Sequence, residues 1–73
     1  MSSIAKVIIV LESREDTPGA DQLVSVDTYD KDDNLIESDQ SDCGNYFHSE
    51  QEAITFYSKN LGLDKSVFTV EFQ

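Results

Sequence analysis

The sequence predicts an α+β fold, in which a four-stranded, mostly antiparallel sheet carries one helix on one face. Two segments, residues 22–29 and 67–72, alternate apolar and polar side chains as half-buried strands do. A third segment, residues 49–61, repeats apolar side chains at helical spacing behind a capping box. Together with an apolar run at residues 4–11, these patterns indicate one domain over residues 1–73.

The first three elements are predicted as strands. Residues 4–11, IAKVIIVL, are apolar at consecutive positions, so we expect a central strand that is covered on both faces or paired on both edges. After a polar loop, residues 22–29 alternate, with Val24, Val26 and Thr28 expected on one face. A hairpin loop at residues 30–34 leads to a short third strand at residues 35–40.

The helix has signals at both of its ends. Ser49 is expected to accept a hydrogen bond from the amide of Glu52, and Gly62 is expected to end the helix in the left-handed conformation. The apolar stripe consists of Ala53, Ile54, Phe56, Tyr57 and Leu61.

The last strand, residues 67–72, should bury Phe68, Val70 and Phe72. The element order is β-β-β-α-β. Because the apolar first strand needs two neighbours, we place the last strand beside it, in the order 3-2-1-4.

Acidity is the most marked property of the composition. Fifteen acidic residues against five basic ones give a net charge of −10, and residues 12–52 hold thirteen of the acids with only two bases. Residues 29–45, YDKDDNLIESDQSDCGN, contain six acids and one lysine. Disorder is one explanation of such charge, but the flanking strand and helix patterns argue against it.

Several kinds of chemistry are not supported by the residues. The single cysteine, Cys43, allows no disulfide within the chain and no Cys/His zinc quartet. The sequence DKDDN at residues 30–34 begins like a calcium-binding EF-hand loop, but Leu35 and Ser41 stand where glycine and glutamate are required. We therefore expect no metal site and no cofactor.

An enzyme is also not expected. Cys43 and His48 could be read as a nucleophile and its base, but Asp39, Asp42 and Glu50 would raise the pKa of the thiol rather than lower it. No pair of carboxylates sits among apolar residues that could separate their pKa values. We also expect no membrane span, because the longest apolar run is too short, and we expect the chain to be cytoplasmic.

Direct nucleic-acid binding is not expected either, because single-strand binders place their aromatic rings in a basic groove and this chain would repel phosphate. Most of the aromatic residues are expected in the core. Tyr29 and Tyr46 border acidic loops and are expected near a contact surface.

The acidic segment has two explanations. It can simply keep the protein soluble, although a net charge of about 2 to 8 in magnitude is enough for that. It can also imitate a row of phosphates and dock on a basic nucleic-acid-binding groove, which it would find quickly through electrostatic steering.

In its size, its acidity over residues 12–52 and a sheet-plus-helix pattern ending in FHSEQEAITFYSKNLG, the chain resembles small acidic inhibitors encoded by bacteriophages. These include anti-CRISPR proteins, anti-restriction DNA mimics and inhibitors of the host polymerase. The resemblance implies stoichiometric binding that blocks a basic site on a host protein, in the host-cell cytoplasm. It transfers no role to any single residue.

The leading hypothesis is therefore a non-enzymatic inhibitor, monomeric or weakly dimeric, that binds a basic nucleic-acid-binding host protein. We expect the hairpin loop and its flanks, rather than the helix, to form the contact surface. The predicted contact residues are Glu15, Asp16, Asp27, Tyr29, Asp30, Asp32, Asp33, Glu37, Asp39 and Asp42. The alternative is a small regulatory module that binds a larger complex such as RNA polymerase through a sheet edge.

Like-charge repulsion predicts that salt stabilises the fold. Raising sodium chloride from about 10 mM to about 300 mM shortens the Debye length to below 10 Å and should raise the melting temperature. Thermal denaturation followed by circular dichroism measures this. A flat or falling melting temperature would contradict the expected repulsion.

Overall fold

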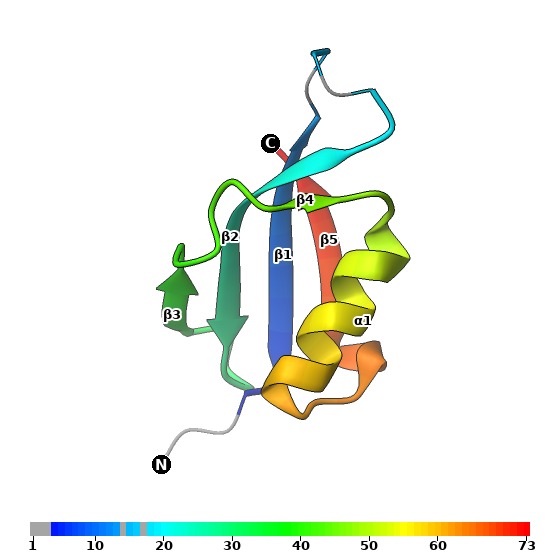
Figure 1. The fold of residues 1–73 in the computed structure, drawn as a ribbon. Helices are drawn as coiled ribbons and strands as arrows, with labels where there is room; N and C mark the ends of the chain where they lie inside the picture. The colour runs from blue at the N-terminus through cyan, green and yellow to red at the C-terminus, as the bar shows by residue number, and fades with distance from the viewer. Residues whose placement is uncertain (1–3, 14, 17) are drawn as a thin grey trace.

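The computed structural model describes residues 4–13, 15–16 and 18–73. Within these residues, five strands form a mixed sheet in the order β3-β2-β1-β5, with β4 pairing with β2. The helix α1 packs on one face of this sheet, and a short 3-10 helix, η1, precedes β5 (Figure 1). This confirms the predicted α+β class and strand order, and the predicted fourth strand is β5. The bounds are β1 (Lys6–Ser13), β2 (Asp21–Tyr29), β3 (Leu35–Asp39), β4 (Tyr46–Phe47), α1 (Glu50–Leu61), η1 (Lys65–Val67) and β5 (Phe68–Phe72).

The central strand is β1, which pairs antiparallel with β2 and parallel with β5. Its alternate residues Val7, Ile9 and Leu11 are fully buried on the face of the sheet that carries α1, whereas Ile8 and Val10 on the other face are half-buried. Of the two explanations for its consecutive apolar residues, pairing on both edges is correct, and α1 covers only one face.

The short strand β4 was not predicted from the sequence. It pairs antiparallel with the start of β2, where the amide of Leu23 donates to the Asn45 carbonyl at 2.7 Å and the amide of Gly44 donates to the Leu23 carbonyl at 3.0 Å. This pairing carries Phe47 into the core, where it is 5% exposed. Two residues are too few to show a periodic pattern, so the sequence carries no strand signal here.

A β-bulge changes the face that part of β2 presents. Leu11 lies opposite Leu23 and Val10 lies opposite Ser25, which leaves Val24 as the extra residue. Leu23 therefore joins the core at 1% exposure, and the expectation that Val24 shares a face with Val26 is wrong. A bulge shifts the alternation by one residue, which strict period-two counting cannot anticipate.

The predicted ends of α1 are confirmed. Ser49 Oγ accepts from the amide of Glu52 at 3.1 Å, and Gly62, with φ of 67°, donates its amide to the Ser58 carbonyl. The carboxylate of Glu52 reaches one residue further back than a capping box requires, and it accepts from the amide of His48 at 3.1 Å.

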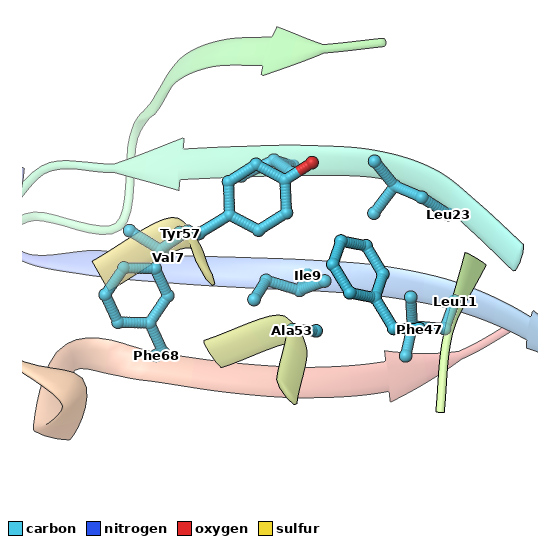
Figure 2. Packing of buried hydrophobic residues seen from close by; sticks show 9 residues of the cluster. Val7, Ile9, Leu11, Leu23, Phe47, Ala53, Tyr57 and Phe68 are labelled. Atoms are coloured by element: carbon cyan, nitrogen blue, oxygen red, sulfur yellow. The ribbon is translucent and has the colours of Figure 1, made fainter. Parts of the chain in front are cut away.

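The buried stripe of α1 is narrower than predicted. Ala53 and Tyr57 are buried over the sheet (Figure 2), whereas Phe56 and Leu61 are 43% and 40% exposed. Phe72 is 51% exposed, because it lies at the end of the edge strand β5 rather than beneath the helix. Sequence periodicity identifies the face of an element but not how far its packing partner extends.

The cap of α1 gives a direct test of this helix. Replacing Ser49 by alanine removes the acceptor for the Glu52 amide and should lower the free energy of unfolding by about 0.5–2 kcal/mol. Urea denaturation measures the loss. Gln51→Ala, on the exposed first turn, is the matched control and should be close to neutral. Equal stability of the two variants would show that the Ser49 cap does not contribute.

Candidate partner-binding surface

The edge strand β3 and its two flanking loops carry most of the predicted contact residues. All five residues of β3 are exposed, and Figure 1 shows this strand at the margin of the sheet, with β2 and β1 between it and α1. We name the acidic edge by its residues: Asp30, Asp32, Asp33, Glu37, Asp39 and Asp42.

Strand β3 is held by its backbone pairing with β2 and by two side chains. Ser38 Oγ donates to Asp27 Oδ1 at 2.6 Å, and Thr28 Oγ1 donates to the Glu37 carbonyl at 3.3 Å. The carboxylate of Asp27 is thus engaged within the sheet. It lies opposite Ile8, on the face that α1 does not cover.

In the hairpin loop, Asp30 serves the loop itself. Its Oδ1 accepts from the amides of Asn34 and Asp32, both at 2.9 Å, and the hydrogen bond from Asn34 chiefly holds the pKa of this carboxyl below its usual value. Asp33 has φ of 64°, in the left-handed region that Asp and Asn tolerate better than most residues. Position 30 therefore needs a hydrogen-bond acceptor, and position 33 needs a residue that tolerates a positive φ.

A lysine partly neutralises this end of the acidic edge. Lys6 Nζ lies 3.0 Å from Asp33 Oδ1 and 4.9 Å from the centroid of the Tyr29 ring. Both charged side chains are well exposed, so the ion pair contributes little to stability. Tyr29 and Asp33 are thus brought together around a base of the same chain.

A groove of about 220 Å³ lies between β3 and α1. Glu37 and Asp39 are paired with Thr28 and Val26, whose side chains face α1, so both carboxylates lie on the helix side of the sheet. The lining residues are Ile4, Val26, Thr28, Ile36, Glu37, Asp39, Asp42, Tyr57, Asn60 and Leu61.

Two of the groove's carboxylates are fixed by hydrogen bonds. Tyr57, buried at 5% exposure, donates its hydroxyl to Asp42 Oδ2 at 3.0 Å. Figure 2 shows that hydroxyl directed over β2, on the side of the core away from β5. The amide of Ser41 donates to Asp39 Oδ1 at 2.9 Å and lowers the pKa of Asp39. Burial, followed by the hydrogen bond and charge of Asp42, raises the pKa of Tyr57 far above that of a free tyrosine.

The structure does not gather all ten predicted contact residues. Glu15 and Asp16 lie in the loop between β1 and β2, at the opposite end of β2 from the hairpin loop. The nine residues of β2 separate the two loops by about 26 Å at 3.3 Å per residue. Asp27 and Tyr29 alternate along β2 opposite Ile8 and Lys6, so both lie on the face that α1 does not cover. Of the ten predicted residues, only the six of the acidic edge lie along β3 and its loops.

Sequence reasoning missed the apolar part of the groove. Ile36 is the extra residue of a second bulge, between the Thr28–Glu37 and Tyr29–Leu35 pairs, and it lines the groove together with Leu61 of α1. The adjacent Leu35 and Ile36 were the available signal, since two neighbouring apolar residues do not fit an alternating strand.

Cys43 and His48, considered as a nucleophile and a base, have separate environments. The Cys43 side chain is exposed, and His48 Nδ1 lies 3.3 Å from Glu52 Oε2 at the start of α1. Within the described residues, no group of three His, Cys, Asp or Glu side chains is placed to hold a metal ion. The part of the chain that the structure describes has no helix long and apolar enough to cross a membrane.

Comparison of this chain with protein-family models, with curated proteins and with solved structures finds no match. Function is therefore inferred from the geometry and charge of the acidic edge and the groove.

The raised pKa of Tyr57 predicts a loss of stability in alkali. The unfolded chain releases this proton near pH 10, and the folded chain releases it at higher pH. The stabilisation is thus complete below about pH 10 and is lost as the pH rises through the folded-state pKa. Tyr57→Phe should cost about 1 kcal/mol at neutral pH, through loss of its hydrogen bond, and should flatten this alkaline decline.

Tyr46→Phe is the control, because Tyr46 is 47% exposed. Urea denaturation at several pH values between 8 and about 11 measures the effect. An alkaline decline of equal slope in wild type and Tyr57→Phe would contradict the assignment to Tyr57.

Proposed function

We propose that this chain is a non-enzymatic acidic inhibitor that binds a basic nucleic-acid-binding surface of another protein and excludes nucleic acid from it. The observation that carries the proposal is the acidic edge: six carboxylates on one exposed strand and its loops, with Lys31 as the only base among residues 30–42. Such a surface is complementary to a groove that normally binds phosphates.

The spacing of the carboxylates supports this reading. Glu37 and Asp39 occupy alternate positions of β3, on one side of the strand, so their Cα atoms are about 6.6 Å apart. Successive phosphates of one DNA strand rise by about 3.4 Å along the helix axis and also turn around it, so neighbouring phosphates are farther apart than this rise and their separation is comparable to the spacing of the two acids. A strand with acids at alternate positions can therefore present charge to lysine and arginine side chains arranged for a phosphate backbone.

Exposure of the acids also supports an intermolecular role. The hydrogen bonds to Asp30 and Asp39 lower the pKa of these two carboxyls and fix their positions, and the hydroxyl of Tyr57 fixes the position of Asp42. None of the three side chains is fully buried. Fixed charges lose less side-chain entropy on binding than mobile ones, which raises affinity for a given number of contacts.

A second candidate function is strand addition at β5. This strand ends the sheet on the side opposite to β3, and of its five residues, FTVEF, only Glu71 is charged. An extended segment of a larger complex could add to this edge through backbone hydrogen bonds. Salt separates the candidates, because phosphate mimicry weakens steeply with ionic strength and strand addition does not.

The test uses charge reversal at acidic-edge positions that the fold does not need. The variant Asp32→Lys/Glu37→Lys changes two exposed side chains and spares Asp30 and Asp33, on which the loop depends. The control, Glu15→Lys/Glu71→Lys, makes the same change in net charge at exposed positions away from the acidic edge.

Each protein is titrated into complexes of fluorescent DNA with a panel of basic DNA-binding proteins, and displacement is followed by anisotropy. Wild type should displace the DNA from its target, the acidic-edge variant should be weaker by roughly tenfold or more, and the control should change by much less. Equal loss in both variants would show that only net charge matters, and absence of displacement by wild type throughout the panel would reject the proposal.

A further inference from the structure

The groove between β3 and α1 has a composition that the rest of the acidic edge lacks. Its two sides carry Ile36 and Leu61, each 40% exposed, and its lining includes the carboxylates of Glu37, Asp39 and Asp42. Among the described residues that line it there is no lysine or arginine. These lining residues therefore combine apolar surface with negative charge.

We propose that this groove receives one arginine side chain of the basic partner, with the aliphatic stem between Ile36 and Leu61 and the guanidinium against the carboxylates. The inference rests on the proposed function and assigns the contact that gives it specificity. Long cationic side chains bury their methylene groups along apolar surface while the charged end pairs with acids, which matches the two halves of this lining.

Arginine fits the lining better than lysine. A guanidinium has five N–H donors in one plane and pairs with carboxylates through two hydrogen bonds at once, whereas an ammonium is a compact and strongly hydrated charge. The groove offers three carboxylates and the side-chain amide of Asn60 as acceptors. Arginine is also enriched in the cores of protein interfaces, where lysine is depleted.

The acceptors are arranged before any partner arrives. Asp42 is held by the Tyr57 hydroxyl at 3.0 Å and Asp39 by the Ser41 amide at 2.9 Å. Within the described residues, no hydrogen bond or ion pair engages the carboxylate of Glu37. Two fixed acceptors and one available acceptor suit a donor with several N–H groups, and the fixed positions reduce the entropy lost on binding.

The first experiment titrates short capped peptides into isotopically labelled protein and follows methyl and amide signals by NMR. The probes are glycine pentapeptides whose central residue is arginine, lysine or citrulline, the last being a neutral analogue of arginine. The arginine peptide should bind with a Kd on the order of 1 mM and shift the methyl signals of Ile36 and Leu61. Lysine should bind more weakly, and citrulline should not bind.

Matched variants locate the contact. Ile36→Ser removes an apolar wall, whereas Leu35→Ser alters its neighbour, which is 56% exposed and does not line the groove. Glu37→Gln removes one groove carboxylate, and Glu15→Gln removes a charge at the far loop. Ile36→Ser and Glu37→Gln should each weaken arginine-peptide binding by roughly three- to tenfold, and both controls by less than about twofold.

Salt dependence adds a readout that a merely structural defect would not reproduce. Glu37→Gln should reduce the slope of log Kd against log salt, whereas Ile36→Ser should leave the slope unchanged. Leu61→Ser repeats the apolar test from α1 in case Ile36→Ser disturbs β3, and the melting temperature of each variant checks that it is folded.

The outcomes separate this inference from the proposed function. If wild type displaces DNA from a basic protein while Ile36→Ser and Glu37→Gln bind that protein and the arginine peptide like wild type, the groove inference is wrong and the proposed function stands. If the arginine peptide occupies the groove but wild type displaces DNA from no protein, the inference stands and the proposed function is wrong. NMR shifts spread over all acidic residues, with equal losses of arginine-peptide affinity in Glu15→Gln and Glu37→Gln, would also contradict the groove inference.

Discussion

The single helix α1 is narrower than the sheet on which it packs. This mismatch determines which strands are buried and which are exposed to water. The twelve residues of α1 span about 18 Å, and its width of about 10 Å corresponds to two or three strands spaced about 4.8 Å apart. The helix lies over β1 and β5, where Val7, Ile9 and Phe68 are buried (Figure 2). Strand β3 is left outside this cover, so its side chains meet water and can be acidic without cost from burial.

The groove is a consequence of the same mismatch. It lies between α1 and the uncovered strand β3, and Tyr57 is one of the residues that line it. The ring of Tyr57 packs in the core against Phe47 and Phe56, with centroids 5.9 and 5.0 Å away, while its hydroxyl reaches the carboxylate of Asp42. One side chain thus joins the packing of the core to the charge of the acidic edge.

Local signals in the sequence predicted the fold well, and long-range contacts account for what they missed. The ends of α1 depend on residues within a few positions of Ser49 and Gly62, and the strand order follows from the connections and from the apolar central strand. The short strand β4 exists because Phe47 finds a place in the core opposite the start of β2, which no local pattern records.

The candidate site was predicted as a charge distribution rather than as a shape. The sequence identifies the acids of residues 30–42, but the face on which Glu37 and Asp39 lie depends on the register of β3 against β2 and on its bulge. The groove itself brings together Ile4, β3 and the end of α1, which are distant in the chain. Glu15 and Asp16 were expected to extend the surface formed by the hairpin, but the length of β2 separates them from it.

The two edges of the sheet help to distinguish a recognition surface from simple protection. Charged side chains on an edge strand prevent unwanted pairing with other chains, and β3 has Glu37 and Asp39 within its five residues. If protection were the sole reason for this charge, the opposite edge would need it equally, yet β5 has only Glu71 and leaves Phe72 51% exposed. The charge is therefore concentrated on the edge that borders the groove. Edge protection alone also does not explain why Tyr57 and Ser41 fix the carboxylates of Asp42 and Asp39 beside exposed apolar side chains.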